Sequence, residues 1–466
     1  MRQPNLVYIL ADQLRYQACG HAGDPLARTP NLDHLAVESV DFAQAVSVTP
    51  LCGPYRASLL TGKYSSSTGM VINELRARPD PDAFGHQLTA AGYDTAYIGK
   101  WHLYGRDYSP EEQFCAPGPY RLGFDGYWAC YNSNHRYYQA FYYRDTFDRV
   151  DVEGFEPDVQ TDLAIEWLRD GRDGSRPFAL FLSYGTPHDP WEWDNCPEEF
   201  NRLFRDVPFP DPPNYAEGSA EYWHPSMTRQ WWMTEYRPHF QQYRQVYYAM
   251  VANLDWNVGR LLRALDEGGL RADTILVFTS DHGEMSGAHG RIAKGIFYEE
   301  ACRVPLLVRW PGRIPAGLVS DACINTPDLM PTLLGLMGLP VPGSVEGADL
   351  SHLALGRRGP ESDAAFLQGM GHTYQWLDGF EWRAVRRKRY TYAVMRADGS
   401  EYLFDNARDP YQMRNLAGEP EHADRLARLR AMLARRREEL NDTFEPCTWY
   451  RDHWTQDGCI LRGAKG

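Results

Sequence analysis

Reactive side chains follow four apolar stretches of the sequence, at the point where each stretch ends. Each stretch is rich in β-branched and aromatic residues and has the length of a β-strand. In an open α/β sheet, ligands bind beyond the carboxyl ends of the strands, so we expect these side chains to meet. In chain order they are Asp12 with Gln13, Lys100 with His102, His188, and Asp281 with His282.

Asp12, Gln13, Asp281 and His282 carry the donor atoms of a metal site. Two carboxylates and a carboxamide oxygen suit a hard cation such as Ca²⁺ or Mg²⁺, and the imidazole leaves room for Mn²⁺ or Zn²⁺. Taken singly, the segment ADQ could cap a helix and SDHGE could form a turn. Their shared position at the ends of two strands favours one bound divalent cation.

Cationic side chains in the same set suit a tetrahedral anion. Lys100 and His102 are two positions apart, so an extended backbone points both to the same side. Lys294 follows the Asp281 segment closely in the sequence, where it either joins them or lies on the surface. His188 stands alone at a strand end, and an isolated histidine is more often structural than catalytic.

Cys52 and Arg56 lie in the segment LCGPYRASLLTG, on either side of Pro54. The residues alone leave open why a thiol stands there, because a packing cysteine would serve as well on a strand. A thiol-based phosphatase needs a longer loop between cysteine and arginine to wrap a phosphate. We therefore expect Cys52 and Arg56 to have another function.

Strands that alternate with helices must position these residues. The strand-like stretches at 5–10, 94–99, 177–185 and 273–280 are joined by segments that include helix-like patterns at 82–92 and 247–269. This order predicts an α/β fold with a large, mostly parallel sheet sandwiched by helices.

Two segments depart from this pattern. An aromatic, acidic and proline-rich insert covers 191–240, and a loop of this length in a compact domain is usually functional. After about 360, a meander-like run with a turn at ADGS precedes an amphipathic helix near 420–440. We predict a catalytic α/β domain over 1–360 and a smaller C-terminal α+β subdomain with a tail over 361–466.

Composition excludes some classes of protein. The 466 residues carry a formal net charge of -14, which disfavours a nucleic-acid partner. No apolar run is long enough to cross a membrane, and the N-terminal segment resembles a first strand more than a signal peptide. We therefore expect a cytoplasmic protein in which most of the nine cysteines are free thiols. Pairing of Cys447 with Cys459 stays open.

The segments resemble those of the sulfatase family. LCGPYRASLLTG is similar to the signature C-x-P-x-R followed by small residues and Thr-Gly, and YIGKWHLYG is similar to the second signature, G-K-W-H-L. Three further segments resemble sulfatases in the family's order: LFLSYGTPHDPW, the region from FTSDHGEM to LLVRWPG, and YLFDNARDPYQMRNL. The resemblance covers residues 5–417, nearly the whole chain.

The resemblance implies a role for each site residue. Cys52 would be oxidised by a maturation enzyme to formylglycine, whose hydrate is the nucleophile. Arg56 and His102 would hold the hydrate, Lys100 and Lys294 would bind the sulfate oxygens, and His188 would protonate the leaving group. The side chain at 52 would contact the cation, most often calcium in this family, together with Asp12, Gln13, Asp281 and His282.

The sequence differs from the usual sulfatase pattern at two proposed metal ligands, and both differences affect the expected metal and substrate. Many sulfatases have a second aspartate where Gln13 stands and often an asparagine where His282 stands, so Mn²⁺ and Mg²⁺ remain possible. The same residues resemble phosphonate and phosphate ester hydrolases that also use formylglycine. A phosphatase relative with a serine or threonine nucleophile is disfavoured by Cys52, and a non-catalytic relative by the complete set.

The leaving group is expected to be a small carbohydrate or an aryl alcohol. Aromatic residues of the insert (Trp191, Trp193, Trp231, Trp232) and the segment QGMGHTYQWLDGFEW could line its pocket, or they could serve packing. The oligomeric state is not indicated by the sequence.

Overall fold

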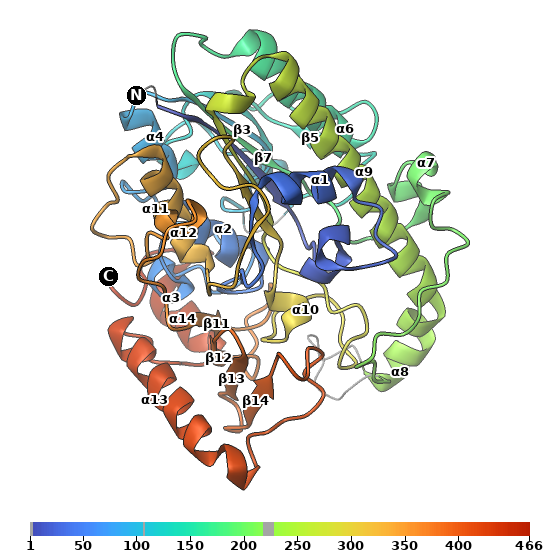
Figure 1. Ribbon diagram of the computed structural model, residues 1–466, viewed down its shortest axis with the longest axis vertical. Coiled ribbons are helices and arrows are strands. Elements are labelled where there is room, and N and C mark those ends of the chain that lie inside the picture. Colours follow the sequence, from blue (N-terminus) through green and yellow to red (C-terminus); the bar gives the residue numbers. More distant parts are fainter. Residues whose placement is uncertain (1–2, 106–107, 218–227) are drawn as a thin grey trace.

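The computed structural model describes residues 3–105, 108–217 and 228–466, and it is built around one eight-stranded sheet (Figure 1). Only β9 runs antiparallel to its neighbours, so the prediction of a mostly parallel sheet is confirmed. In sheet order, the strands are β10 (Leu318–Ser320), β2 (Val40–Phe42), β9 (Leu306–Arg309), β8 (Thr274–Ser280), β1 (Asn5–Ala11), β7 (Phe178–Ser183), β3 (Asp94–Lys100) and β4 (Tyr127–Tyr131).

The four strands predicted from the sequence lie side by side in the middle of the sheet, as β8, β1, β7 and β3. They are buried along almost their whole length, as expected for parallel strands covered on both faces. Their register aligns their carboxyl ends: Ala11 pairs with Ser280, Leu10 with Ser183, and Gly99 with Ser183. The residues that follow the strands are therefore brought to one edge of the sheet.

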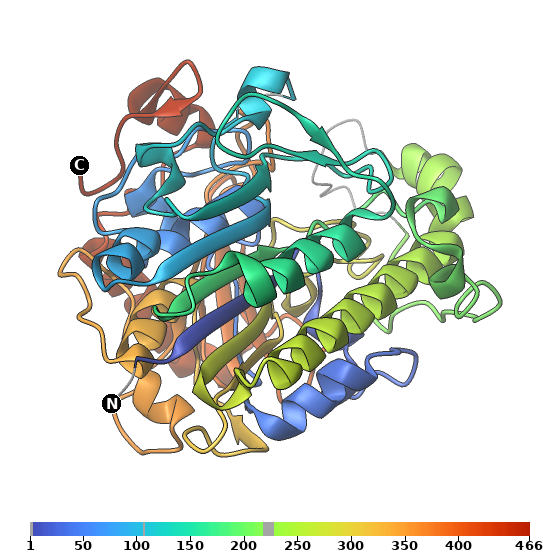
Figure 2. The same ribbon diagram turned by 90° about the horizontal axis from the view of Figure 1, so that it is seen from above.

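Helices cover both faces of this sheet (Figure 2). One face packs against α1 (Pro30–Glu38), α6 (Glu156–Glu166) and the long α9 (Phe240–Glu267), which contacts both of the others. The other face packs against α2 (Cys52–Thr61), α4 (Phe84–Ala90) and α11 (Thr326–Met337). Alternate residues of β1 point into the two cores, as the twofold period of a strand requires.

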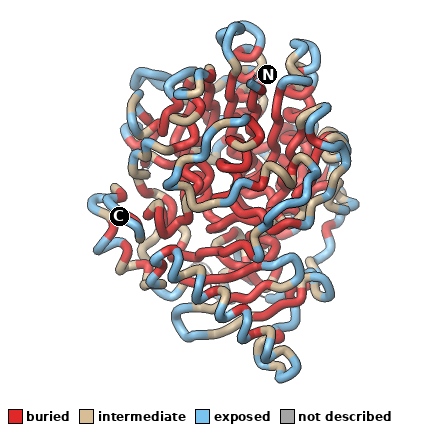
Figure 3. Tube along the Cα trace, turned by 60° about the vertical axis from the view of Figure 1, so that its left-hand side comes forward, coloured by how far each residue is buried: buried red, intermediate tan, exposed pale blue. Residues whose placement is uncertain are grey.

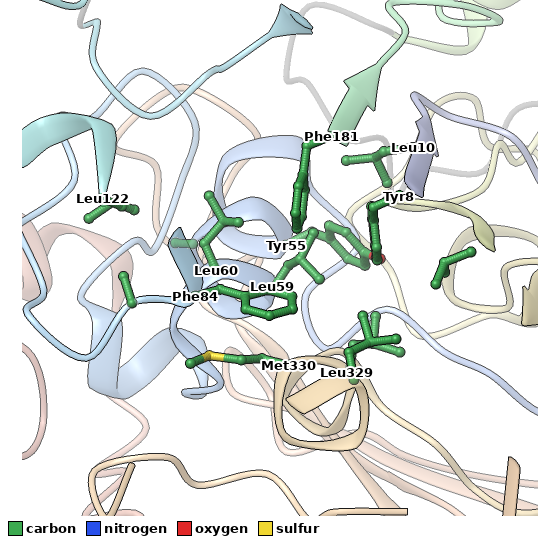
Figure 4. Close-up of a cluster of buried hydrophobic side chains, with 14 of the residues drawn as sticks. Tyr8, Leu10, Tyr55, Leu59, Leu60, Phe84, Leu122, Phe181, Leu329 and Met330 are labelled. Carbon is green, nitrogen blue, oxygen red and sulfur yellow. The ribbon is translucent and has the colours of Figure 1, made fainter. Parts of the chain in front are cut away.

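Helix α2 is buried at every position. Figure 4 shows its residues Tyr55, Leu59 and Leu60 packed between Phe181 of the sheet and Leu329 of α11. The helix ends at Gly62, whose φ of 65° lies in the left-handed region that favours glycine. Because both sides of α2 are packed, its first residue, Cys52, has a fixed position relative to the strand ends.

The C-terminal part forms a second, antiparallel sheet of β11 (Ala365–Gly369), β12 (Trp382–Arg386), β13 (Tyr390–Met395) and β14 (Glu401–Asp405). Helix α13 (Ala423–Glu439) packs on it through a leucine face, and α14 (Cys447–Trp454) precedes the short pair β15 (Thr455–Gln456) and β16 (Cys459–Ile460). The predicted meander and helix are confirmed. The boundary at 360/361 stays a prediction.

The remaining α-helices and strands of the described chain are short. They are the helices α3 (Ser65–Thr68), α5 (Pro110–Gln113), α7 (Glu198–Asn201), α8 (Arg229–Trp231), α10 (Glu299–Cys302) and α12 (Ser351–Ala354), and the strands β5 (Phe141–Tyr142) and β6 (Val150–Asp151). None of the helices within the described ranges is long and apolar enough to cross a membrane.

Burial separates the sheet core from the connecting loops (Figure 3). In the insert, the indole N–H of Trp191 donates to the carbonyl of Pro187 at 2.8 Å, and Trp232 is buried against Tyr215 and Tyr236. These tryptophans therefore serve packing, and residues 218–227 of the insert lie outside the described part. All nine cysteines are free, so Cys447 and Cys459 are not paired.

Candidate active site

Cys52 lies at the point where the strand ends meet. Its thiol is buried, 3.2 Å from Nε2 of His282 and 3.6 Å from Oδ1 of Asp12. The ammonium group of Lys100 lies 3.9 Å from the sulfur. The first residue of α2 thus contacts groups from β1, β3 and β8, three of the four strands selected from the sequence.

Ligand atoms of Asp12, Cys52, Asp281 and His282 all lie within 4.8 Å of one another, and all four residues are buried. Two carboxylate oxygens and an imidazole nitrogen in such proximity fit a divalent cation. The register of β1 with β8 explains the convergence, because Asp12 and Asp281 each follow one member of the pair Ala11–Ser280. The identity of the ion stays a prediction.

Gln13, the further predicted ligand, adopts a φ of 71°. Its backbone N–H donates to Oδ1 of Asp281 at 3.0 Å, and its amide nitrogen donates to Oε2 of Glu284 at 2.6 Å. The amide oxygen consequently points the other way and accepts a hydrogen bond from Lys294. Glu284 therefore determines which end of the amide faces the site.

Glu284 is itself fixed by the backbone. Its Oε1 accepts hydrogen bonds from the N–H groups of Ser286 at 2.8 Å and Ala293 at 2.9 Å. Burial raises the pKa of Glu284 to about 7, against the lowering effect of these two donors. Together with the amide nitrogen of Gln13, these two N–H groups donate to both carboxylate oxygens of Glu284, which therefore act as acceptors.

Arg56 connects the two metal-site carboxylates. One guanidinium nitrogen lies 3.2 Å from Oδ2 of Asp12 and 3.2 Å from Oδ2 of Asp281. The other donates to the Lys100 carbonyl and to Oγ of Ser183, both at 2.7 Å. Burial opposes the charge on Arg56, but the two carboxylates raise its pKa overall. Its predicted role in holding residue 52 stays a prediction.

Lys100 also neutralises Asp12, since its ammonium group lies 2.7 Å from Oδ2 of that residue. Burial alone would raise the pKa of Asp12, but the charges of Lys100 and Arg56 hold it well below its ordinary value. Asp12 is consequently ionised and Lys100 is charged, so the site presents fixed charges before any ligand binds.

His102 follows β3 with a φ of 54°, and its Nε2 lies 3.2 Å from Oε1 of Glu74. Burial and Lys100 lower the pKa of His102, but hydrogen bonds to Cys52 and Glu74 raise it above its ordinary value. The predicted pair of Lys100 and His102 is therefore placed beside Cys52.

His188 and Lys294 form a second cationic part of the site. The ammonium group of Lys294 lies 2.7 Å from Nε2 of His188, whose Nδ1 lies 2.9 Å from the carbonyl oxygen of Asp189. The imidazole of His135 stacks on that of His188, with 3.9 Å between ring centroids. Burial, then His135 and Lys294, lower the pKa of His188 well below its ordinary value.

A pocket of about 340 Å³ opens beside Lys294. It lies between the loop at 291–296, which follows β8, and the C-terminal antiparallel sheet with its connecting loops. Its wall combines charged, polar and aromatic side chains with glycine backbone, and part of it comes from QGMGHTYQWLDGFEW. The lining residues are Arg291, Lys294, Gly295, Ile296, Gly371, His372, Thr373, Asp378, Gly379, Phe380, Met395, Ala397, Asp398 and Tyr402.

The structure thus brings all ten residues selected from the sequence into one site, and it adds three that the sequence reasoning missed. Glu284 lies two positions after His282 and could have been found from that spacing. Glu74 and His135 lie in loops away from the selected strand ends. Their contacts with His102 and His188 depend on how the loops fold.

Comparison with known proteins identifies the family. The family model "Sulfatase" matches residues 4–339, and "N-sulphoglucosamine sulphohydrolase, C-terminal" matches 287–439. An ulvan-active sulfatase of Formosa agariphila is 37% identical over 96% of this chain and 84% of its own length. An N-acetylglucosamine-6-O-sulfatase of Bacteroides thetaiotaomicron is 29% identical over 95% of this chain and 87% of its own.

Among solved structures, a protein in complex with its substrate D-glucosamine-2-N,6-O-disulfate has a TM-score of 0.80 and 27% identity. The match covers 97% of this chain and 99% of that one. The agreement of family model, relatives and fold extends over both sheets. The chain belongs to the sulfatase family of the alkaline phosphatase superfamily and is a sulfuric ester hydrolase.

Proposed function

We propose that this protein hydrolyses the sulfate monoester of a small carbohydrate, with a formylglycine formed from Cys52 and one divalent cation. The observation that carries this proposal is the pocket lined in part by Lys294, whose ammonium group also contacts Gln13 and His188 of the site. Its volume of about 340 Å³ is at the small end of the roughly 300–1,000 Å³ of small-molecule sites. Such a pocket suits one sugar unit better than the interior of a long polymer.

The lining of the pocket supports a sugar as the leaving group. Asp378, Asp398 and Thr373 offer polar groups to hydroxyls, and Phe380 and Tyr402 offer flat apolar faces. The names of two relatives and the substrate bound in the solved relative describe carbohydrate-directed sulfatases.

The arrangement of the reactive residues supports a displacement at sulfur. A divalent cation held by Asp12, Gln13, Asp281 and His282 would supply positive charge beside residue 52. Lys100 and Lys294 would bind the sulfate oxygens and offset the charge that develops on them. Each ammonium group already lies within hydrogen-bond distance of a residue of the metal site, Asp12 or Gln13.

The reaction then has two steps. One hydroxyl of the residue-52 hydrate gives up its proton to solvent, and its oxygen bonds to sulfur while the bond from sulfur to the alcohol oxygen breaks. His188 supplies the proton that the alcohol oxygen takes. The remaining hydroxyl at residue 52 then gives its proton to solvent as the bond from carbon to the sulfate oxygen breaks. Sulfate departs, the aldehyde returns, and water restores the hydrate.

His188 must gain a proton for this role, because its Nε2 faces the ammonium group of Lys294 and its pKa is lowered. A sulfate ester between the two would attract Lys294 and free Nε2. We therefore propose that substrate binding, rather than the resting site, sets the protonation of His188.

A second candidate is hydrolysis of a phosphonate or phosphate ester by the same residues. Gln13 and His282 favour it, since they stand where many sulfatases have aspartate and asparagine. The test compares a phenyl sulfate, a phenyl phosphonate and a panel of sulfated mono- and disaccharides. We expect the highest kcat/KM on a sugar sulfate, and a higher value on the phenyl phosphonate than on any sulfate would select the second candidate.

A further inference from the structure

The loop between α3 and α4 carries a carboxylate that contacts the proposed machinery. Oε1 of Glu74 lies 3.2 Å from Nε2 of His102, and the two side chains are 15% and 3% exposed. His102 and Lys100 counteract burial and hold the pKa of Glu74 below its ordinary value, so the carboxylate is ionised. An ionised carboxylate can only accept hydrogen bonds, which places a hydrogen on Nε2 of His102.

The same loop is tied to the nucleophile and to the pocket. The side-chain oxygen of Asn73 accepts a hydrogen bond from the N–H of Gly53 at 2.9 Å, next to Cys52. The backbone N–H of Asn73 donates to the carbonyl of Thr373, in the pocket wall, at 2.8 Å. These two hydrogen bonds of Asn73 therefore fix the position of the neighbouring Glu74 relative to residue 52 and to the pocket wall.

Both members of the contact lie on unusual backbone. Glu74 has a φ of 60° and His102 a φ of 54°, and neither is a glycine, an asparagine or an aspartate. The left-handed region is unfavourable for residues that carry a Cβ atom. Conformations of this kind persist where surrounding contacts impose them, and they cluster at functional sites.

The second ring nitrogen of His102 has a different environment. Nδ1 is buried and has no hydrogen-bond partner within the part of the chain that the structure describes. Residue 52 lies close to His102, because a Cβ atom on the next residue, Gly53, would stand 3.5 Å from the carbonyl oxygen of His102. With a hydrogen on Nε2, the neutral ring has its lone pair on Nδ1, where it can accept from a hydroxyl.

We propose that Glu74 is a positioning residue, whose carboxylate fixes the tautomer and orientation of His102 so that Nδ1 accepts from an oxygen at residue 52. The inference rests on the proposed function only in naming that oxygen as a hydroxyl of converted Cys52. Without the carboxylate, the ring can turn about its Cβ–Cγ bond and exchange its two nitrogens. Charge-assisted hydrogen bonds of this kind are stronger than neutral ones.

The test uses Glu74→Gln. Its amide can either donate to Nε2 of His102 or accept from it, so the variant no longer favours the tautomer with a hydrogen on Nε2. Glu112→Gln is the matched control, because Glu112 is also buried and pairs at 3.0 Å with Arg76, two positions after Glu74. The first measurement is the nitrogen NMR shifts of the His102 ring in protein with unconverted Cys52, which need no activity.

At a pH well above the raised pKa of His102, where the ring is neutral, we expect a single Nε2–H tautomer in the wild type and in Glu112→Gln, and a mixture in Glu74→Gln. In converted enzyme, kcat of Glu74→Gln should fall roughly 10–100-fold with KM nearly unchanged, as for other residues that orient a functional histidine. Glu74→Asp, which keeps an acceptor, should recover part of the loss.

A tautomer ratio in Glu74→Gln equal to that of the wild type would overturn the inference, whatever the activity. A fixed tautomer in a wild-type protein that hydrolyses no sulfate ester would instead contradict the proposed function and leave the positioning intact. A fall in kcat that Glu112→Gln shares would assign the effect to the stability of the loop and also count against Glu74.

Discussion

The ammonium group of Lys294 lies 2.7 Å from Nε2 of His188 in the described structure. The nitrogen that faces Lys294 must act as an acceptor, because an ammonium group can only donate. His188 is thus neutral until a substrate separates it from Lys294. Its proposed role, protonation of the leaving group, requires that it first gain a proton. The structure places the proposed leaving-group acid beside the charge that would be attracted to the sulfate.

His188→Ala should slow hydrolysis of a sugar sulfate far more than that of an activated aryl sulfate. An alkoxide leaving group needs a proton, whereas a phenoxide of low pKa leaves without one. Loss of one positioned general acid costs roughly 10²–10⁴-fold, and we expect that loss on the sugar substrate. The measurement is kcat/KM on both substrates, and equal losses would remove His188 from this role.

Glu284→Gln should weaken binding of the divalent cation roughly 10–100-fold, because the amide of Gln13 would lose the acceptor that orients it. Calorimetric titration with Ca²⁺ and Mn²⁺ measures this without reference to activity. Glu300→Gln is the control: Glu300 is a buried carboxylate that accepts from an asparagine amide at 2.8 Å, outside the metal site. Equal affinity in Glu284→Gln and the wild type would show that Gln13 needs no such support.

Protonation of His289 should lower the free energy of unfolding of the protein in mild acid. Burial, with Arg291, lowers its pKa to about 4, and its ring stacks on Tyr298 with 3.8 Å between centroids. The unfolded state then binds more protons, so this stabilisation is complete above the ordinary pKa of about 6.5 and is lost as pH falls toward 4. The full difference is at most about 3 kcal/mol.

The check compares urea unfolding of the wild type and of His289→Phe at about pH 7.5 and about pH 4.5. Phenylalanine keeps a ring against Tyr298 and cannot titrate. The free energy of unfolding of the wild type should fall more steeply with acid than that of the variant. Parallel pH dependence of the two proteins would contradict the lowered pKa.

The sequence predicted the central strands well because each is a continuous apolar run that ends in a polar residue. Since parallel strands share one carboxyl edge, that pattern also predicted that Asp12 and Asp281 would meet, as the Ala11–Ser280 register shows. Contacts made by loops could not be predicted in this way. Glu74 contacts His102 from a loop in which its own backbone φ is 60°, and the apolar and polar pattern of INELRARP does not predict that conformation.

The aromatic insert is a second place where the sequence did not predict the role of its residues. Its tryptophans suggested a pocket, but an aromatic side chain stabilises a core as readily as it binds a sugar. In the structure, Trp191 and Trp232 are buried within the insert and against α9, and the pocket is lined from the C-terminal segment instead. Composition alone could not distinguish these two uses, since both require the same residue types.

The most direct test of the account measures sulfate release from a sulfated monosaccharide together with the mass of the peptide that contains residue 52. Samples made with increasing amounts of the maturation enzyme should show activity in proportion to the fraction in which the thiol has become an aldehyde. Cys52→Ala, treated alike, should release no sulfate. Full activity in Cys52→Ala, or in protein with unconverted Cys52, would contradict the central claim.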